Sequence, residues 1–144
     1  MIRAFVDSSV LFSACLSTTG ASREVLREGA IGNVMLVISE DVVDETERNL
    51  LKKRSDALPV LYNLLSFFDI EVVNPTAQEV SEAAQYTMYK DAPIVAAAKK
   101  AGTTYLVSLN RRHLVGVPEV SAGSGLSIVL PEELLRQIRE GQQS

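Results

Sequence analysis

Short runs of aliphatic and β-branched residues alternate along the chain with longer segments in which apolar residues recur every three or four positions. A nearly unbroken apolar run is typical of a strand that is buried on both faces of a parallel sheet, whereas the longer pattern is typical of helices. Strands that alternate with helices predict βαβ units and an α/β fold. The expected strands are Ile2–Val6, Val34–Ile38, Ile70–Val73, Tyr105–Val107 and Ser127–Val129.

Several of the expected helices carry boundary signals. Ser39 precedes an acidic first turn, and Thr76 stands three residues before Glu79, as in a capping box. Gly102 follows an Ala/Lys-rich segment, where a left-handed residue favours the end of a helix. The expected helices are Ser8–Leu16, Ser22–Ala30, Glu40–Lys53, Asp56–Phe68, Ala77–Met88, Ala92–Ala101 and Pro131–Gly141.

The length of 144 residues is that of one ordinary domain. We therefore expect residues 1–140 to form a single domain and residues 141–144 to be a frayed tail. The segment Gly116–Gly125 contains several Gly and Ser residues, and we expect it to be a flexible surface connection within that domain.

Composition narrows the class of protein. The single cysteine, Cys15, excludes a disulfide framework and a cysteine-based zinc site, and its apolar neighbours indicate a small core residue. Residues 1–7 lack the apolar stretch of a signal peptide, and no apolar run approaches the ~20 residues of a membrane span. We therefore expect a protein of the reducing cytoplasm that has no membrane partner.

The net charge of −4 argues against a domain that holds nucleic acid by bulk electrostatics, because such domains usually carry a basic excess. A cluster of metal-binding carboxylates would produce the same acidic total, since the charge of the bound cation is missing from the count. Any contact with nucleic acid must therefore be local.

Polar residues follow the first and the fourth expected strands. Asp7 comes directly after Ile2–Val6, at the carboxyl edge where open α/β sheets bind ligands. Ser108 and Asn110 follow Tyr105–Val107 and offer neutral ligands or hydrogen-bonding groups. A purely structural role for Asp7, as the cap of the next helix, stays open.

Two further acids lie on expected helices. Glu45 is three to four residues from Asp41 and Val42, so it lies near the apolar edge of a helix whose other acids form a solvated face. Asp91 begins an alanine-rich helix, where it can bind a cation or cap the helix. His113 is expected to be a structural residue rather than a metal ligand.

Four segments together resemble the PIN-domain family of metal-dependent ribonucleases, which includes VapC-like toxins of toxin–antitoxin systems. Residues 7–11 match its opening Asp-x-Asn/Ser-Val-Leu, and Ser39 with Glu45 matches its Ser followed six residues later by an acid. Residues 91–97 match Asp-Ala-x-Ile-x-Ala-Ala, and residues 106–111 match Leu-Val-Thr-x-Asp/Asn-Arg. The resemblance covers nearly the whole chain.

The resemblance implies a three-layer αβα fold with a central parallel sheet of about five strands, and an endoribonuclease that uses Mg²⁺ or Mn²⁺. It implies that Asp7, Glu45 and Asp91 hold the metal. Asn110 takes the fourth site position, where many members have Asp, and this departure favours a single tightly bound ion over two. The residues expected to assist or to bind the RNA backbone are Ser9, Ser108, Arg111, Arg112 and Lys90.

The resemblance also implies partners: an RNA substrate, an antitoxin that inserts a basic side chain among the carboxylates, and a second copy of the chain in a homodimer. One alternative keeps the fold without turnover, as a module that binds RNA or protein, and Asn110 is its best support. A receiver-like signalling domain is disfavoured because only one acid, Asp7, follows the first strand. A dinucleotide-binding domain is disfavoured because no G-x-G-x-x-G motif follows that strand.

Overall fold

The computed structural model describes residues 1–143. They contain a five-stranded sheet in which every neighbouring pair of strands is parallel, in the order β3-β2-β1-β4-β5. Each strand lies within a segment that the sequence predicted to be a strand, so the expected parallel α/β sheet is confirmed. The strands are β1 (Arg3–Val6), β2 (Met35–Ile38), β3 (Glu71–Val72), β4 (Tyr105–Val107) and β5 (Ser127–Val129).

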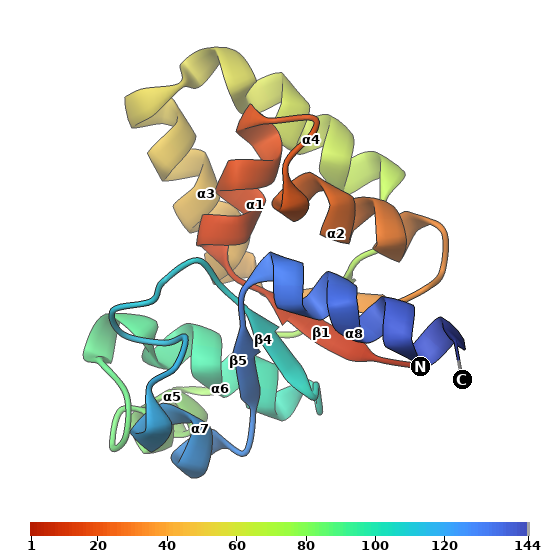
Figure 1. Cartoon of the computed structure of the whole chain (residues 1–144). Helices are drawn as coiled ribbons and strands as arrows, with labels where there is room; N and C mark the ends of the chain where they lie inside the picture. Colours follow the sequence, from red (N-terminus) through yellow and green to blue (C-terminus); the bar gives the residue numbers. More distant parts are fainter. Residues whose placement is uncertain (144) are drawn as a thin grey trace.

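Helices cover both faces of the sheet (Figure 1). One layer contains α1, α2 and α8, and the other contains α5, α6 and α7, while α3 and α4 pack against α1. This arrangement confirms the expected three-layer αβα fold. The α-helices are α1 (Ser8–Leu16), α2 (Ala21–Ala30), α3 (Glu40–Lys53), α4 (Leu58–Phe67), α5 (Ala77–Ala83), α6 (Ala92–Lys100), α7 (Pro118–Ser124) and α8 (Pro131–Gln143), and the short 3₁₀ turns are η1 (Ser55–Ala57) and η2 (Tyr89–Asp91).

The core is aliphatic and centres on β1. Residues 4–6 of this strand have no exposed surface, because strands on either side and helices on both faces cover them. The α6 helix contributes a run of small buried side chains at residues 96–98, which lets it contact both β2 and β4. Cys15 is buried in this core as expected, and burial raises the pKa of its thiol to about 11.

One expected helix ends early, and another is divided. The helix expected over Ala77–Met88 ends at Ala83, because the chain then tightens into turns in which the Tyr86 N–H donates to the Ala83 carbonyl. The segment Asp56–Phe68 divides into η1 and α4, since Pro59 stands in the first turn of α4, where its missing N–H costs little.

The expectation of a flexible connection over Gly116–Gly125 is wrong, because residues 118–124 form α7. Val120 is buried, and the Ser124 hydroxyl donates to the Val120 carbonyl at 2.6 Å. Gly125 ends the helix at a φ of +75°. Gly123 packs against Tyr86 so closely that an added Cβ would lie 2.3 Å from the ring Cγ. The glycine at this position therefore serves close packing rather than flexibility.

Gly123→Ala is expected to destabilise the protein by about 1–3 kcal/mol through overpacking against Tyr86. Alanine normally stabilises an exposed helix position relative to glycine, so Gly141→Ala in α8 is the matched control, because nothing lies within 4 Å of its added Cβ. Urea denaturation measures both free energies of unfolding. A Gly123→Ala protein as stable as the wild type would contradict this close contact.

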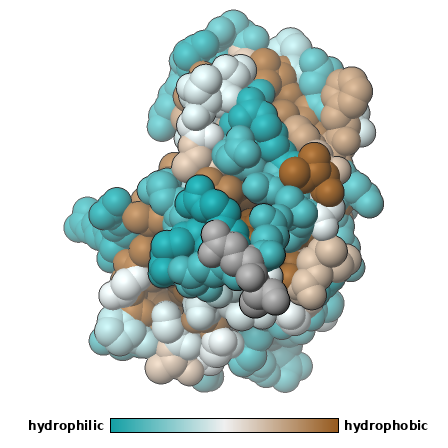
Figure 2. Space-filling model, turned by 45° about the vertical axis from the view of Figure 1, so that its right-hand side comes forward, coloured by the Kyte–Doolittle hydropathy of each residue, from teal (hydrophilic) through white to brown (hydrophobic). Residues whose placement is uncertain are grey.

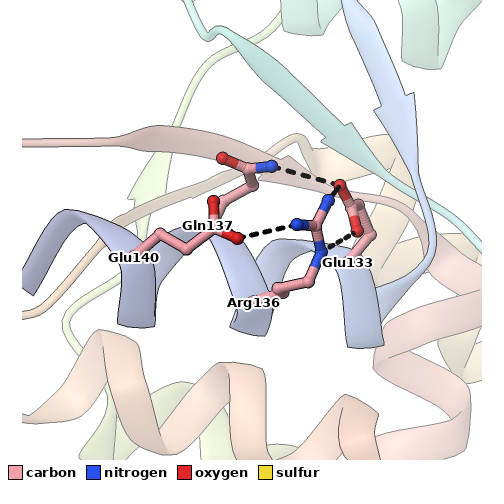
Figure 3. A network of polar contacts seen from close by, with 4 residues as sticks. All are labelled: Glu133, Arg136, Gln137 and Glu140. Atoms are coloured by element: carbon pink, nitrogen blue, oxygen red, sulfur yellow. Dashed lines mark hydrogen bonds and ion pairs between the residues drawn. The ribbon is translucent and has the colours of Figure 1, made fainter. Parts of the chain in front are cut away.

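The outer face of α8 carries a network of charged and polar side chains (Figure 3). Arg136 bonds to Glu133 and Glu140, and Gln137 donates to Glu133. Exposed pairs of this kind contribute little to stability. The helix continues to Gln143, through residues that we expected to fray, and the same expectation for Ser144 lies outside the described residues.

The surface is largely hydrophilic on the face seen in Figure 2, where hydrophobic residues form small separate groups. The large hydrophobic side chains that are most exposed come from different elements, such as Ile31 after α2, Phe67 in α4 and Tyr89 in η2. Across residues 1–143, no helix combines the length and the apolar character needed to cross a bilayer.

Candidate active site

The strand order reverses between β1 and β4, which are neighbours in the sheet although β2 and β3 separate them in the chain. Such a switch point leaves a crevice at the carboxyl ends of the two strands, where open α/β sheets bind ligands. Asp7 follows β1 and Ser108 follows β4, so both lie at this crevice. The sequence prediction that these polar segments meet at one edge of the sheet agrees with this arrangement.

Asp7 is almost fully buried and caps α1. Its Oδ1 accepts hydrogen bonds from the Val10 N–H at 3.2 Å and from the Ser9 hydroxyl at 2.5 Å. The capping role that the sequence left open is therefore real. Both bonds use the same oxygen, so capping does not exclude a second role for this carboxylate.

Burial raises the pKa of Asp7 above its ordinary value, while hydrogen bonds from Ser108, Ser9 and the Val10 N–H lower it. Burial has the largest effect because it removes the carboxylate from water. A cation beside Asp7 would offset that cost. The hydrogen bonds to Asp7 therefore offset only part of the cost of burying its negative charge.

Ser9 joins the two halves of the crevice. Its hydroxyl donates to Asp7 and accepts from the Leu109 N–H at 3.0 Å, so it connects the end of β1 to the segment after β4. Ser108 is fully buried, and its Oγ accepts from the Asn110 N–H at 3.0 Å. Ser108 thus supports the site from inside the fold.

Asn110 closes the turn after β4. Its Oδ1 accepts a hydrogen bond from the His113 N–H at 3.0 Å. The oxygen that would be the natural metal ligand of an Asn side chain is thus engaged with the backbone. This geometry gives Asn110 the structural task of shaping the segment that carries Arg111 and Arg112.

Asp91 lies where η2 meets α6 and is buried. Its side chain makes no capping hydrogen bond to α6, so the capping alternative is wrong for this residue. Its Oδ2 is buried and has no hydrogen-bond partner within residues 1–143. Buried polar atoms are nearly always paired, and an unpaired carboxylate oxygen is a strong indication of a missing ligand.

The pKa of Asp91 is raised above its ordinary value, chiefly by burial and also by the negative charge of Glu45. The positive charges of Lys90 and His113 act in the opposite direction. The structure therefore brings Asp91 and Glu45 within electrostatic reach of each other. A cation beside Asp91 would offset both the burial of its carboxylate and the negative charge of Glu45.

Glu45 is half-buried on α3 and lines a groove together with Ser9 and Leu109. Its neighbours Asp41 and Asp44 are exposed. The expectation that Glu45 differs from the solvated acids of its helix is thus consistent with its position. Glu45 shares this groove with Ser9, whose hydroxyl donates to Asp7, and its negative charge acts on Asp91.

The residues present fit a hard divalent cation. Mg²⁺ binds carboxylate oxygens, keeps several waters and commonly uses only one or two protein carboxylates. Among residues 1–143, no three His, Cys, Asp or Glu side chains gather closely enough to form a complete metal cage. Within the described residues, the expected set of Asp7, Glu45 and Asp91 is therefore not gathered into such a cage. The buried carboxylate of Asp7 and the unpaired Oδ2 of Asp91 are the oxygens available to a partly hydrated ion.

The basic residues expected to contact RNA are exposed. Arg111, Arg112 and Lys90 form no side-chain ion pair with any residue of the described chain. Lys90 is adjacent to Asp91, and Arg112 lines a cavity of about 360 Å³ together with His113. All three are therefore free to meet an anionic ligand near the carboxylates.

Sequence reasoning missed the groove that continues from Glu45 between α1 and α3. Phe12, Asn49 and Lys53 line it. A signal was available, since residues 45, 49 and 53 recur every four positions and so share one face of α3. The acidic residues at the start of this helix instead indicate a solvated face.

Comparison with known proteins identifies the fold. The profile of the family described as PIN domain matches residues 3–112. The PAE2754 protein of Pyrobaculum aerophilum has a similar structure, with a TM-score of 0.65 and 20% identity over 96% of this chain and 90% of that one. FitAcB from Neisseria gonorrhoeae gives a TM-score of 0.59 and 16% identity over 90% and 98% of the two chains.

A third similar structure is VapC20 from Mycobacterium tuberculosis, described as a toxin that cleaves the sarcin–ricin loop. It gives a TM-score of 0.50 and 20% identity over 72% of this chain and 86% of that one. Among curated proteins, no sequence matches this chain significantly. At these levels of identity, the structural likeness establishes a shared fold.

Proposed function

This chain belongs to the PIN-domain family, and we propose that it is a ribonuclease that hydrolyses RNA phosphodiester bonds with Mg²⁺ or Mn²⁺. The observation that carries the proposal is the buried, unpaired Oδ2 of Asp91. The negative charge of Glu45, which acts on Asp91, adds support, as does the buried Asp7 at the switch point of the sheet. If Asp91 had only a structural role, its buried Oδ2 would be expected to have a hydrogen-bond partner.

We assign Asp7 and Asp91 as the residues that would hold the ion, with Glu45 beside them. When bound, a divalent cation lowers the pKa of a coordinated water and stabilises negative charge on the phosphoryl oxygens. Asn110 completes the site by shaping the turn after β4 rather than by adding a fourth carboxylate. One tightly bound ion therefore suits this donor set.

The remaining site residues position the carboxylates and the substrate. Ser9 orients Asp7 through a hydrogen bond and fixes it relative to the segment after β4. Arg111 and Arg112 lie on that same segment, where they would bind backbone phosphates. Lys90 would add positive charge next to Asp91. No covalent nucleophile is needed, which agrees with the inert, buried Cys15.

The toxin role is the finer part of the proposal. The Mycobacterium tuberculosis neighbour is described as a toxin that cleaves the sarcin–ricin loop. By extension, this chain would act on RNA as the toxin of a toxin–antitoxin pair and would form a homodimer. Its antitoxin would cover the acidic crevice and insert a basic side chain among the carboxylates, because that charge would replace the cation.

Incubation of labelled single-stranded and structured RNAs with the purified protein tests the function. We expect cleavage with Mg²⁺ or Mn²⁺ and none when EDTA removes the metal. The same rate with EDTA would contradict metal dependence. Binding of RNA without cleavage under any metal would favour the alternative of a PIN-like binding module that has lost turnover.

A further inference from the structure

A groove of about 440 Å³ runs between α1 and α3 and begins at the candidate site. Ser9 and Glu45 line its inner end, so the groove and the site share two residues. Ser9 also binds Asp7 directly. A ligand that occupies the groove therefore lies next to the carboxylates. A nucleic-acid strand that reaches the site can continue along the groove.

The groove wall on α3 consists of Glu45, Asn49 and Lys53. These residues are four positions apart, so they follow one another on the same face of the helix. At 1.5 Å per residue, Glu45 and Lys53 are separated by about 12 Å along the helix axis. A phosphate bound at Lys53 would therefore lie further along the groove than one bound beside Glu45.

Lys53 is the cation of this groove, and Phe12 on α1 positions it. The Lys53 Nζ lies 5.7 Å from the centroid of the Phe12 ring, within the range of a cation–π contact. Within the described residues, no carboxylate forms an ion pair with Lys53. Its ammonium thus sits at the groove with hydrogen-bond donors left for an anion.

The opposite side of the groove combines serine hydroxyls of α1 with the apolar side chains of Phe12 and Leu109. Bases of single-stranded nucleic acid stack on aromatic side chains, and their phosphates bind Lys and Arg. The side-chain amide of Asn49 can donate to and accept from a base edge. A cation, an amide and an aromatic side chain therefore occur together in this groove.

We propose that this groove binds the single-stranded part of the RNA substrate, and that Lys53, positioned by Phe12, binds a backbone phosphate a few nucleotides from the scissile one. The inference rests on the proposed function, because it takes the carboxylates as the place of cleavage. It also explains how a chain with a net charge of −4 holds RNA locally. The positive charge that would bind the phosphate is Lys53, at the end of the groove away from Glu45.

Lys53→Ala and Lys52→Ala form a matched pair for the test, because both lysines are exposed at the end of α3 and Lys53 alone lines the groove. The probe is a short fluorescein-labelled single-stranded RNA, with Ca²⁺ replacing Mg²⁺ and binding followed by fluorescence anisotropy. We expect Lys53→Ala to weaken binding about fivefold and to reduce the slope of log K against log salt by about 0.7. Lys52→Ala should behave like the wild type.

A second measurement locates the phosphate. Neutral methylphosphonates are placed one at a time along the same RNA, and binding is measured for the wild type and both variants. We expect one modification, away from the cleaved bond, to weaken binding by the wild type and by Lys52→Ala. The same modification should leave Lys53→Ala unaffected, because the charge pair is already lost.

Equal binding and equal salt slopes for the two lysine variants would overturn the inference, as would a wild-type protein that fails to bind the single strand. Failure of the proposed function has a different signature. If the wild type binds RNA through Lys53 yet never cleaves it with Mg²⁺ or Mn²⁺, the groove assignment is supported and the ribonuclease assignment is wrong.

Discussion

Asp7→Asn is expected to lower the rate of RNA cleavage by about a hundredfold or more, because the variant loses a charged oxygen ligand at the crevice. The fold should survive. Asn is as good a helix cap as Asp, so it can still accept the bonds from Val10 and Ser9 that Asp7 accepts now. The measurement is single-turnover cleavage of labelled RNA with saturating Mg²⁺.

Asp44→Asn is the matched control for this experiment. Asp44 is an exposed acid next to Glu45 on α3, so its removal changes the net charge by the same amount without touching the crevice. We expect its cleavage rate to equal that of the wild type. Equal rates for Asp7→Asn and the wild type, in a variant that keeps its melting temperature, would remove Asp7 from the site.

Asp91→Asn is expected to have opposite effects on metal binding and on stability. The variant should lose the stabilisation by Mn²⁺ that the wild type shows, because binding to the folded state alone raises its stability. Without metal, the variant should be more stable than the wild type by roughly 1 kcal/mol, since the buried charge with its unpaired oxygen is gone.

The stability difference should depend on pH in a defined direction. Burial and Glu45 raise the pKa of Asp91 above its ordinary value of 3.8, although Lys90 and His113 oppose them. In the metal-free wild type, Asp91 therefore makes its full contribution to stability at pH values below that ordinary value. This contribution is lost as the pH rises through the raised pKa. The advantage of Asp91→Asn should grow over the same range.

Urea denaturation at acidic and neutral pH, with and without Mn²⁺, measures these effects together. Metal-free wild type and variant should converge in stability at acidic pH, where Asp91 is protonated. If Mn²⁺ stabilises Asp91→Asn as strongly as the wild type, the ion lies elsewhere. If the metal-free variant is less stable than the wild type at neutral pH, the result contradicts an unpaired carboxylate oxygen at Asp91.

The sheet was predictable because its strands are short, apolar and buried on both faces. Each of the five expected segments contains the observed strand, and β4 and β5 agree in both ends. The strong capping signals also gave correct helix starts, as at Ser39 and Thr76, where the side chains accept the expected backbone hydrogen bonds. Local signals of this kind need no tertiary information.

The α7 helix could not be predicted from local signals. Its glycines and serines are typical of loops, and what makes the helix possible is the contact between Gly123 and the distant Tyr86. A buried Val120 and the Ser124 hydrogen bond then stabilise the helix. Such contacts between residues far apart in sequence leave no periodic pattern.

The contacts of the candidate site residues could not be predicted from the sequence. Asp7 and Asp91 both stand at helix starts, where capping and ligand binding have the same sequence pattern. The structure separates them, because Asp7 caps α1 and Asp91 makes no capping bond. The engagement of Asn110 with the His113 N–H likewise depends on side-chain geometry that spacing does not encode.

Crystals grown with Mn²⁺ would locate the ion through its anomalous scattering. We expect one Mn²⁺ in the crevice at the ends of β1 and β4, bound by carboxylate oxygens of Asp7 and Asp91 and by water, with Glu45 beside it. An ion bound elsewhere, or an empty crevice at a Mn²⁺ concentration that supports RNA cleavage, would contradict this expectation.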